Sequence, residues 1–256
     1  MPSKTPSLIT LPELYKNIFI EENYLSEKKD KGVIARAKDI IDFSLDNIKI
    51  NKDSKIIDVG SGSGWLSYNL KDRLDLKPLA VDFSGQAAKL AKKIYGIDTK
   101  IVDFDKSLPF NSGSFDAAFC IEVIEHVADP NFLLQEIRRI LKPRGYLILT
   151  TPNLASYYNR LLLLAGFQPL SLEVSRIKKD YGLGRLKKRF GKLPPSGHLR
   201  LFTRPALMDI LKDSKFSVVA ERGLPISGLS LFLQAMESSF AKIPSLSSDL
   251  LVIGQK

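Results

Sequence analysis

Residues 56–65, Ile-Ile-Asp-Val-Gly-Ser-Gly-Ser-Gly-Trp, constrain the fold of this chain more than any other stretch. The apolar first half is typical of a buried parallel strand, and glycines at alternate positions predict a sharp turn into a helix. Without a Cβ, each glycine lets its backbone amides approach a ligand closely, and the helix that follows presents unpaired N–H groups. The stretch therefore predicts a strand, a nucleotide-type loop and a helix.

The rest of the chain continues this alternation of strands and helices. Further strands are expected at about 78–82, 99–102, 114–120, 145–151, 216–220 and 250–254. Helices are expected at about 33–48, 65–74, 84–95, 130–141 and 203–212. The pattern predicts an α/β fold with a doubly wound, mostly parallel, seven-stranded Rossmann-like sheet. Ligands of such folds bind beyond the carboxyl ends of the strands.

The chain divides into four parts. We expect an N-terminal arm at 1–32, a cofactor-binding core at 33–153, a basic insertion at 154–200 and a return to the same α/β domain at 201–256. From Leu154 to Arg204 there are 11 Lys or Arg and 2 acids, while the whole chain carries a net charge of +10. The insertion follows the fifth strand, so we interpret it as a lid over the active site. Its charge would attract an anionic substrate, nucleic acid or an anionic lipid surface, or would simply keep a connecting segment solvated.

The composition excludes several other classes of protein. A hydrophobic content of 44% is enough for a packed core. The single cysteine, Cys120, excludes an intramolecular disulfide and a cysteine-based zinc site, and its apolar surroundings suggest an inert core residue. No apolar run approaches about 18 residues, and the N-terminus lacks the apolar core of a signal peptide. We therefore expect a cytoplasmic protein without a transmembrane segment; the sequence does not predict an oligomeric state.

Further motifs follow the glycine loop in a fixed order. Asp82 ends the second strand, Val102-Asp103-Phe104 follows the third, Glu122-Val123-Ile124-Glu125-His126 follows the fourth, and Lys142-Pro143-Arg144-Gly145 precedes the fifth. Together they resemble the class I S-adenosylmethionine-dependent methyltransferases over about 33–153 and 198–220. A nicotinamide enzyme would need a similar loop, but with the spacing Gly-x-Gly-x-x-Gly.

The resemblance implies a role for each matching residue. Asp58 and the glycine loop would hold the amino-acid end of S-adenosylmethionine, and Asp82 would bind the ribose hydroxyls. Phe83 would lie beside the adenine, while Asp103 and the backbone N–H of Phe104 would bind its polar edge. The implied cofactor-binding set is Asp58, Gly60, Ser61, Gly62, Gly64, Asp82, Phe83, Asp103, Phe104 and Glu122.

The two histidines of the chain, His126 and His198, are the candidate catalytic residues, as a base or as contacts to the acceptor. Glu122, Glu125, His126 and His198 also resemble the divalent metal sites of the ubiquinone-pathway O-methyltransferases and of the small-RNA 3′-end 2′-O-methyltransferases. A metal there would lower the pKa of an acceptor hydroxyl. The sequence favours the other reading, in which no metal binds, Glu122 faces the cofactor and His126 only packs or caps.

The sequence predicts methyl transfer to a small-molecule acceptor or to a lipid or glycan precursor. The basic insertion and the later histidine support the alternative of an RNA acceptor, although no separate RNA-binding module is visible. A third alternative is a non-catalytic cofactor-binding protein on the same fold. Neither the acceptor nor its reacting atom can be read from the sequence.

Overall fold

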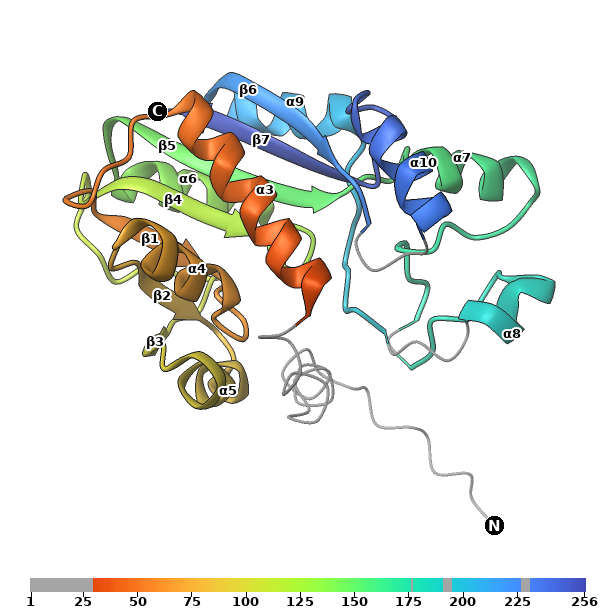
Figure 1. The fold of residues 1–256 in the computed structure, drawn as a ribbon, viewed down its shortest axis with the longest axis horizontal. Coiled ribbons are helices and arrows are strands. Elements are labelled where there is room, and N and C mark those ends of the chain that lie inside the picture. Colours follow the sequence, from red (N-terminus) through yellow and green to blue (C-terminus); the bar gives the residue numbers. More distant parts are fainter. Residues whose placement is uncertain (1–29, 176, 191–194, 227–230) are drawn as a thin grey trace, which may run out of the picture.

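The computed structural model describes residues 30–175, 177–190, 195–226 and 231–256 (Figure 1). Its strands form a seven-stranded sheet in the order β3-β2-β1-β4-β5-β7-β6. β7 is antiparallel to both of its neighbours, and the remaining pairs are parallel. The predicted mostly parallel, doubly wound sheet is therefore confirmed. The strands are β1 (Ile56–Val59), β2 (Leu79–Asp82), β3 (Thr99–Ile101), β4 (Phe115–Ile121), β5 (Leu141–Pro152), β6 (Ser217–Leu224) and β7 (Asp249–Gln255).

Helices α3, α5, α6 and α9 begin at residues whose side chains cap them. Ser84, Asp129 and Thr203 each accept a hydrogen bond from a backbone N–H of the first turn of a helix. Proline follows Asp129 at the first helical position, as the sequence predicts. The helices are α3 (Lys31–Asn47), α4 (Trp65–Leu74), α5 (Gly85–Tyr95), α6 (Pro130–Ile140), α7 (Tyr157–Leu164), α8 (Lys187–Phe190), α9 (Arg204–Asp213) and α10 (Leu231–Ala241), with a short 3-10 helix, η2 (Gly184–Leu186).

The sheet is covered on both faces, and alternate side chains of its central strand explain why. Ala117 and Phe119 of β4 pack in the cluster that contains Ile40 of α3 and Leu66 of α4. Ala118 and Cys120 point to the opposite face, into the cluster built with α6 and α9. Cys120 is fully buried, and burial raises the pKa of its thiol, as suits a core residue.

The glycine loop follows β1 and lies against the turn that follows β4. The three glycines 60, 62 and 64 have positive φ angles of 75°, 53° and 86°, which favour glycine over other residues. A Cβ at Gly60 would lie 2.3 Å from Cγ2 of Val123. The order of the strands reverses between β1 and β4, so this close approach places the loop at the switch point of the sheet, where α/β folds bind ligands.

Some element boundaries differ from the expected ones. β5 begins at Leu141 rather than near 145, because Leu141 already pairs with Phe115 and the Lys-Pro-Arg-Gly turn forms an irregularity within the ladder. Arg144 in this turn has a positive φ of 63°. β6 continues to Leu224, beyond the expected 220.

Most of the expected N-terminal arm, residues 1–29, lies outside the described residues. Asp30 caps α3 through the amides of Gly32 and Val33. None of the helices in the described ranges is long and apolar enough to cross a membrane.

Candidate active site

Asp82, at the carboxyl end of β2, ties the glycine loop to the sheet. Its carboxylate accepts hydrogen bonds from the Gly62 amide at 2.8 Å and from the Ser84 amide at 2.8 Å. The residue is buried, and burial raises the pKa of the carboxyl, although these amides act in the opposite direction. The side chain predicted to bind ribose hydroxyls thus also fixes the shape of the loop.

Asp58 lies in β1, directly before the loop. Its carboxylate accepts a 2.6 Å hydrogen bond from the Ser67 hydroxyl of α4, and burial raises its pKa to about 7. The hydroxyls of Ser61 and Ser63 in the loop are buried and have no hydrogen-bond partner among the described residues. A buried polar atom without a partner costs free energy, so these hydroxyls suit a polar ligand that supplies the missing bonds.

The residues predicted to surround an adenine ring come together at the ends of β2 and β3. The rings of Phe83 and Phe104 lie edge to face, with centroids 6.3 Å apart. Asp103 is exposed, and its carboxylate forms a 3.0 Å ion pair with Lys106. A hydrogen bond from Lys106 lowers the pKa of Asp103, so this carboxylate is ionised and faces solvent.

Glu122 occupies a strained position directly after β4, with a positive φ of 56°. Its carboxylate accepts hydrogen bonds from Arg36 of α3 at 2.9 Å and from the Thr150 hydroxyl at 2.7 Å. Arg36 also reaches Asp249 at the start of β7, at 2.7 Å. The structure therefore pairs the Glu122 carboxylate with Arg36 rather than placing it with Glu125 and the histidines.

Glu125 lies three residues further along the same turn and is fully buried. One carboxylate oxygen accepts a 3.0 Å hydrogen bond from the Thr151 hydroxyl. The other, Oε1, has no hydrogen-bond partner among the described residues. Burial, followed by repulsion from Glu122, raises the pKa of Glu125 well above its usual value. A cation beside Oε1 would relieve both the missing contact and the cost of burying the charge.

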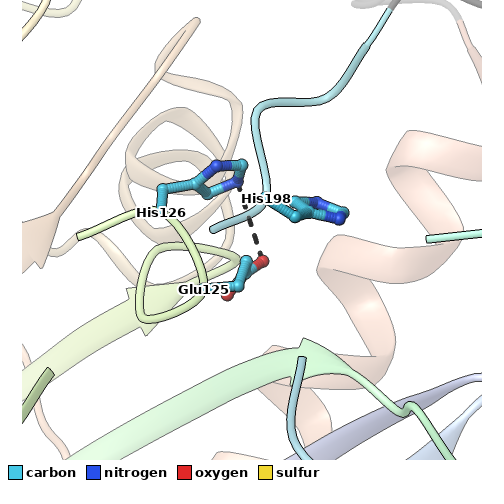
Figure 2. A group of neighbouring side chains, drawn as sticks. All are labelled: Glu125, His126 and His198. Atoms are coloured by element: carbon cyan, nitrogen blue, oxygen red, sulfur yellow. Dashed lines mark ion pairs between the residues drawn. The ribbon is translucent and has the colours of Figure 1, made fainter. Parts of the chain in front are cut away.

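His126 and His198 meet beside Glu125, although they are far apart in the sequence (Figure 2). Their ring centroids are 4.9 Å apart, and His126 Nε2 lies 3.8 Å from Glu125 Oε1. Nδ1 of His126 faces the Gly197 carbonyl at 3.2 Å, and Nδ1 of His198 faces the Ser171 carbonyl at 2.9 Å. A carbonyl only accepts, so each ring carries its proton on Nδ1 and keeps a lone pair on Nε2.

These three side chains form a group with the chemistry of a metal site. Each offers one ligand atom, and the three atoms lie within 4.8 Å of one another. Burial, followed by the neighbouring His198, lowers the pKa of His126 to about 3, and burial also lowers the pKa of His198. Both imidazoles are therefore neutral at pH 7, which is the form that binds metals.

Hydrogen bonds to backbone groups hold the segment that carries His198 against the turn after β4. The Leu199 amide donates to the Glu125 carbonyl at 2.9 Å, and Arg200 donates to the carbonyls of Val127 and Ala128. Glu173 accepts hydrogen bonds from the amides of Ser196 and Gly197. The segment before α9 is therefore held on both sides.

Three residues around this site were not expected from the sequence: Arg36, Asp249 and Glu173. A signal existed for Arg36, because it lies one turn from Val33 and from Ile40 on the apolar face of its helix, where an arginine needs a partner. No comparable pattern marks Asp249 or Glu173, whose partners are distant in sequence.

A cavity of about 500 Å³ lies elsewhere, at the amino ends of β1, β2 and β4, and is lined by Lys52, Ile56, Leu79 and Phe115 among others. It opens at the edge of the sheet opposite to the glycine loop and contains none of the predicted site residues. The convergence of motifs at the carboxyl ends, rather than the size of this cavity, identifies the candidate site.

A family profile described as a methyltransferase domain matches residues 30–221 of the chain. The ubiquinone biosynthesis O-methyltransferase of Xanthomonas oryzae pv. oryzae is 35% identical over 106 residues, which are 39% of this chain and 44% of that protein. The matched stretch thus spans less than half the length of this curated relative.

Solved structures share the fold over nearly the whole chain. A chain from the complex between the Haloferax volcanii Trm112 methyltransferase activator and a methyltransferase is 18% identical, with a TM-score of 0.61, and the match covers 92% of this chain and 96% of that chain. A Thermotoga maritima S-adenosylmethionine-dependent methyltransferase is 20% identical, with a TM-score of 0.57, over 93% of this chain and 99% of that chain. At these identities the likeness is one of fold.

Proposed function

Since this chain belongs to the methyltransferase domain family, as an S-adenosylmethionine-dependent class I member, we propose that it methylates a hydroxyl of a small-molecule acceptor. The acceptor would lie against Glu125, His126 and His198. The observation that carries the proposal is that His198, from the segment before α9, meets Glu125 and His126 at the turn after β4, and that this turn approaches the glycine loop through Val123 and Gly60. Donor and acceptor groups would then meet at the switch point of the sheet.

The loop and its neighbours fit the cofactor. The unpartnered hydroxyls of Ser61 and Ser63 and the glycines between β1 and α4 suit a polar ligand end, and Asp58 lies beneath them. Asp82 would bind the ribose hydroxyls, and the Phe83 and Phe104 rings would flank the adenine. S-adenosylmethionine supplies an activated methyl group, so the chain itself needs mainly to orient the acceptor and exclude water.

The acceptor hydroxyl must lose its proton. His126, with a pKa lowered to about 3, is a poor base for that purpose at neutral pH. Its Nε2 is better suited to binding a divalent cation together with Glu125 and His198. Such a cation would lower the pKa of the hydroxyl. Glu122 would act indirectly, since Arg36 and Thr150 hold its carboxylate.

The Xanthomonas relative is a ubiquinone biosynthesis O-methyltransferase, which supports oxygen as the methylated atom. The match covers only 44% of that protein, so the identity of the acceptor does not carry over with it. An RNA acceptor is the alternative that the basic residues of 154–204 favour. In that case the chain should bind RNA with an affinity that falls steeply with salt, whereas a small-molecule acceptor predicts no such binding.

Manganese binding tests the proposed site directly. Electron paramagnetic resonance on the full chain with S-adenosylhomocysteine should show bound Mn²⁺, and both His126→Ala and His198→Ala should weaken binding at least about tenfold, since each removes one of few ligands. Asp53→Ala changes an exposed acid outside the group and outside the cofactor-binding set, so it is the matched control and should leave binding unchanged.

The enzyme should form S-adenosylhomocysteine when it is given simple phenols or aliphatic alcohols as acceptors. This turnover should stop when a chelator removes divalent cations and should return when Mg²⁺ or Mn²⁺ is added. If chelated enzyme keeps full turnover and both histidine variants bind Mn²⁺ like the wild type, the metal-assisted mechanism is wrong.

A further inference from the structure

Exposed apolar side chains gather in one stretch of the insertion. Among the described residues, six of the twelve exposed large hydrophobic side chains lie between 161 and 181. Leu164 at the end of α7 is 85% exposed, the highest of the twelve. Burying such side chains is favourable, so a local concentration of them marks a surface that contacts something else. The six are Leu161, Leu163, Leu164, Val174, Ile177 and Tyr181.

Basic side chains accompany this apolar group. Lys178, Arg185, Lys187 and Lys188 are exposed, and they lie within the same part of the chain. From 154 to 204 the sequence holds 11 basic residues and 2 acids, so this part of the chain is strongly basic. We call these ten exposed residues, the six apolar and the four basic, the insertion surface.

The fold directs the insertion surface away from the sheet. Figure 1 shows α7 and α8 beyond the ends of the strands, with α7 beside α10. The first turn of α7 is anchored there: the Tyr157 ring stacks on Phe240 with centroids 4.1 Å apart, and Asn159 is buried. The exposed leucines lie in the second half of this eight-residue helix, beyond the anchored turn, and extend into solvent.

We propose that the insertion surface docks on an anionic membrane surface. Leucines at the tip of a short helix would enter the boundary between headgroups and acyl chains, and the flanking lysines and arginines would lie at the anionic headgroups. RNA would satisfy the basic residues but would leave the leucines in water, because phosphate recognition uses cationic and polar side chains and base recognition uses aromatic ones. A membrane satisfies both halves of the surface.

Contacts within the insertion connect this surface to the candidate active site. The Ser171 carbonyl faces Nδ1 of His198, and the nearly buried Glu173 accepts hydrogen bonds from the amides of Ser196 and Gly197. Lys179 donates to the Ser196 hydroxyl at 2.8 Å. Docking would thus hold the segment that carries His198. An acceptor carried by a lipid would then enter beside His198, a step that rests on the proposed function.

Vesicle flotation of the full chain tests the docking. The probes are phosphatidylcholine vesicles with and without about one third phosphatidylglycerol, at about 100 mM salt. The wild type should float only with the anionic vesicles. Leu161→Ser/Leu163→Ser/Leu164→Ser and Lys178→Gln/Lys187→Gln/Lys188→Gln should each reduce binding at least about tenfold.

Matched controls keep the same chemistry but lie elsewhere. Val218→Ser/Val219→Ser changes exposed apolar residues of the edge strand β6, and Lys52→Gln/Lys77→Gln/Lys89→Gln removes three exposed lysines outside the insertion. Both controls should bind anionic vesicles like the wild type. Circular dichroism melts check that each variant is folded.

A wild type that does not float with anionic vesicles overturns the proposal, and so does a folded leucine variant that floats unchanged. Binding of a 20-nucleotide RNA that depends on the three lysines but not on the leucines, without vesicle binding, would assign the surface to RNA instead. Calorimetry with S-adenosylmethionine is independent of these results. A chain that binds the cofactor but not vesicles disproves docking alone.

Discussion

At Gly60 the backbone leaves no space for a side chain. The residue has a φ of 75°, and the turn after β4 comes so close that a Cβ would collide with Val123. The glycine spacing and the acid Asp82 could be recognised in the sequence because both belong to one local strand-loop-helix pattern. The pairing of Glu122 with Arg36 could not be foreseen, because it joins residues 86 positions apart and depends on where α3 crosses the sheet.

Gly60→Ala should therefore be more costly than Gly96→Ala. Gly96 has nearly the same φ, 72°, but a Cβ there would meet nothing within 4 Å. Gly96→Ala should cost only the backbone strain, about 1 kcal/mol of unfolding free energy, while Gly60→Ala should add about 1–3 kcal/mol from overpacking. Urea unfolding of both variants measures the difference, and equal losses would mean that Val123 simply moves aside.

Asp58→Asn should stabilise the free protein at alkaline pH. The pKa of Asp58 is raised to about 7 in the folded chain, so the folded state binds a proton that the unfolded state has already lost above about pH 4. Its contribution to stability is thus fully present below pH 4 and is lost as the pH rises through 7. The asparagine variant should gain about 1–2 kcal/mol over the wild type at pH 8 and little at pH 4. Thermal melts from pH 4 to pH 8 measure the stability difference between the variant and the wild type. A difference that does not change with pH would contradict this prediction.

At the scale of elements, Arg36 links α3 to the sheet through ion pairs. Arg36 bridges Glu122, after β4, and Asp249, at the start of β7. Burial alone would lower the pKa of Arg36, but the two carboxylates outweigh this effect and raise it. Burial raises the pKa of Asp249 to about 6. The apolar spacing of α3 predicted the helix, with bounds within two residues of the observed Lys31–Asn47. It did not show which strands the helix would join.

Arg36→Leu should cost about 2–3 kcal/mol of unfolding free energy, because two carboxylates lose their shared partner in a largely buried position. Adding Asp249→Asn should recover part of this loss. Arg73→Leu is the control, since its pair with Asp42 is more exposed and should contribute less than about 1 kcal/mol. Similar losses for Arg36→Leu and Arg73→Leu in denaturant titrations would show that burial of the pair has little effect.

For the whole molecule, the mostly parallel, doubly wound sheet and the place of the motifs at the carboxyl ends of its strands follow from the alternation of strands and helices. The register of β5 could not be predicted in this way, because its irregularity at the Lys-Pro-Arg-Gly turn arises from pairing with Phe115. The path of the insertion was equally hidden, since 167–200 has no helical or strand period and is held by isolated contacts such as Glu173 with Ser196 and Gly197. Those contacts bring His198 to His126 and complete the candidate site.

Titration calorimetry of the full chain with S-adenosylmethionine tests whether the cluster of motifs at the carboxyl ends of the strands is a methyl-donor site. The wild type should bind this cofactor and S-adenosylhomocysteine at micromolar concentrations. Asp82→Ala should weaken binding at least about tenfold, because hydrogen bonds to a carboxylate are lost. Asp53→Ala, an exposed acid before β1, should bind like the wild type. Tight binding of NAD without binding of S-adenosylmethionine, or an Asp82→Ala variant with unchanged affinity, would show that the glycine loop and Asp82 do not form a methyl-donor site.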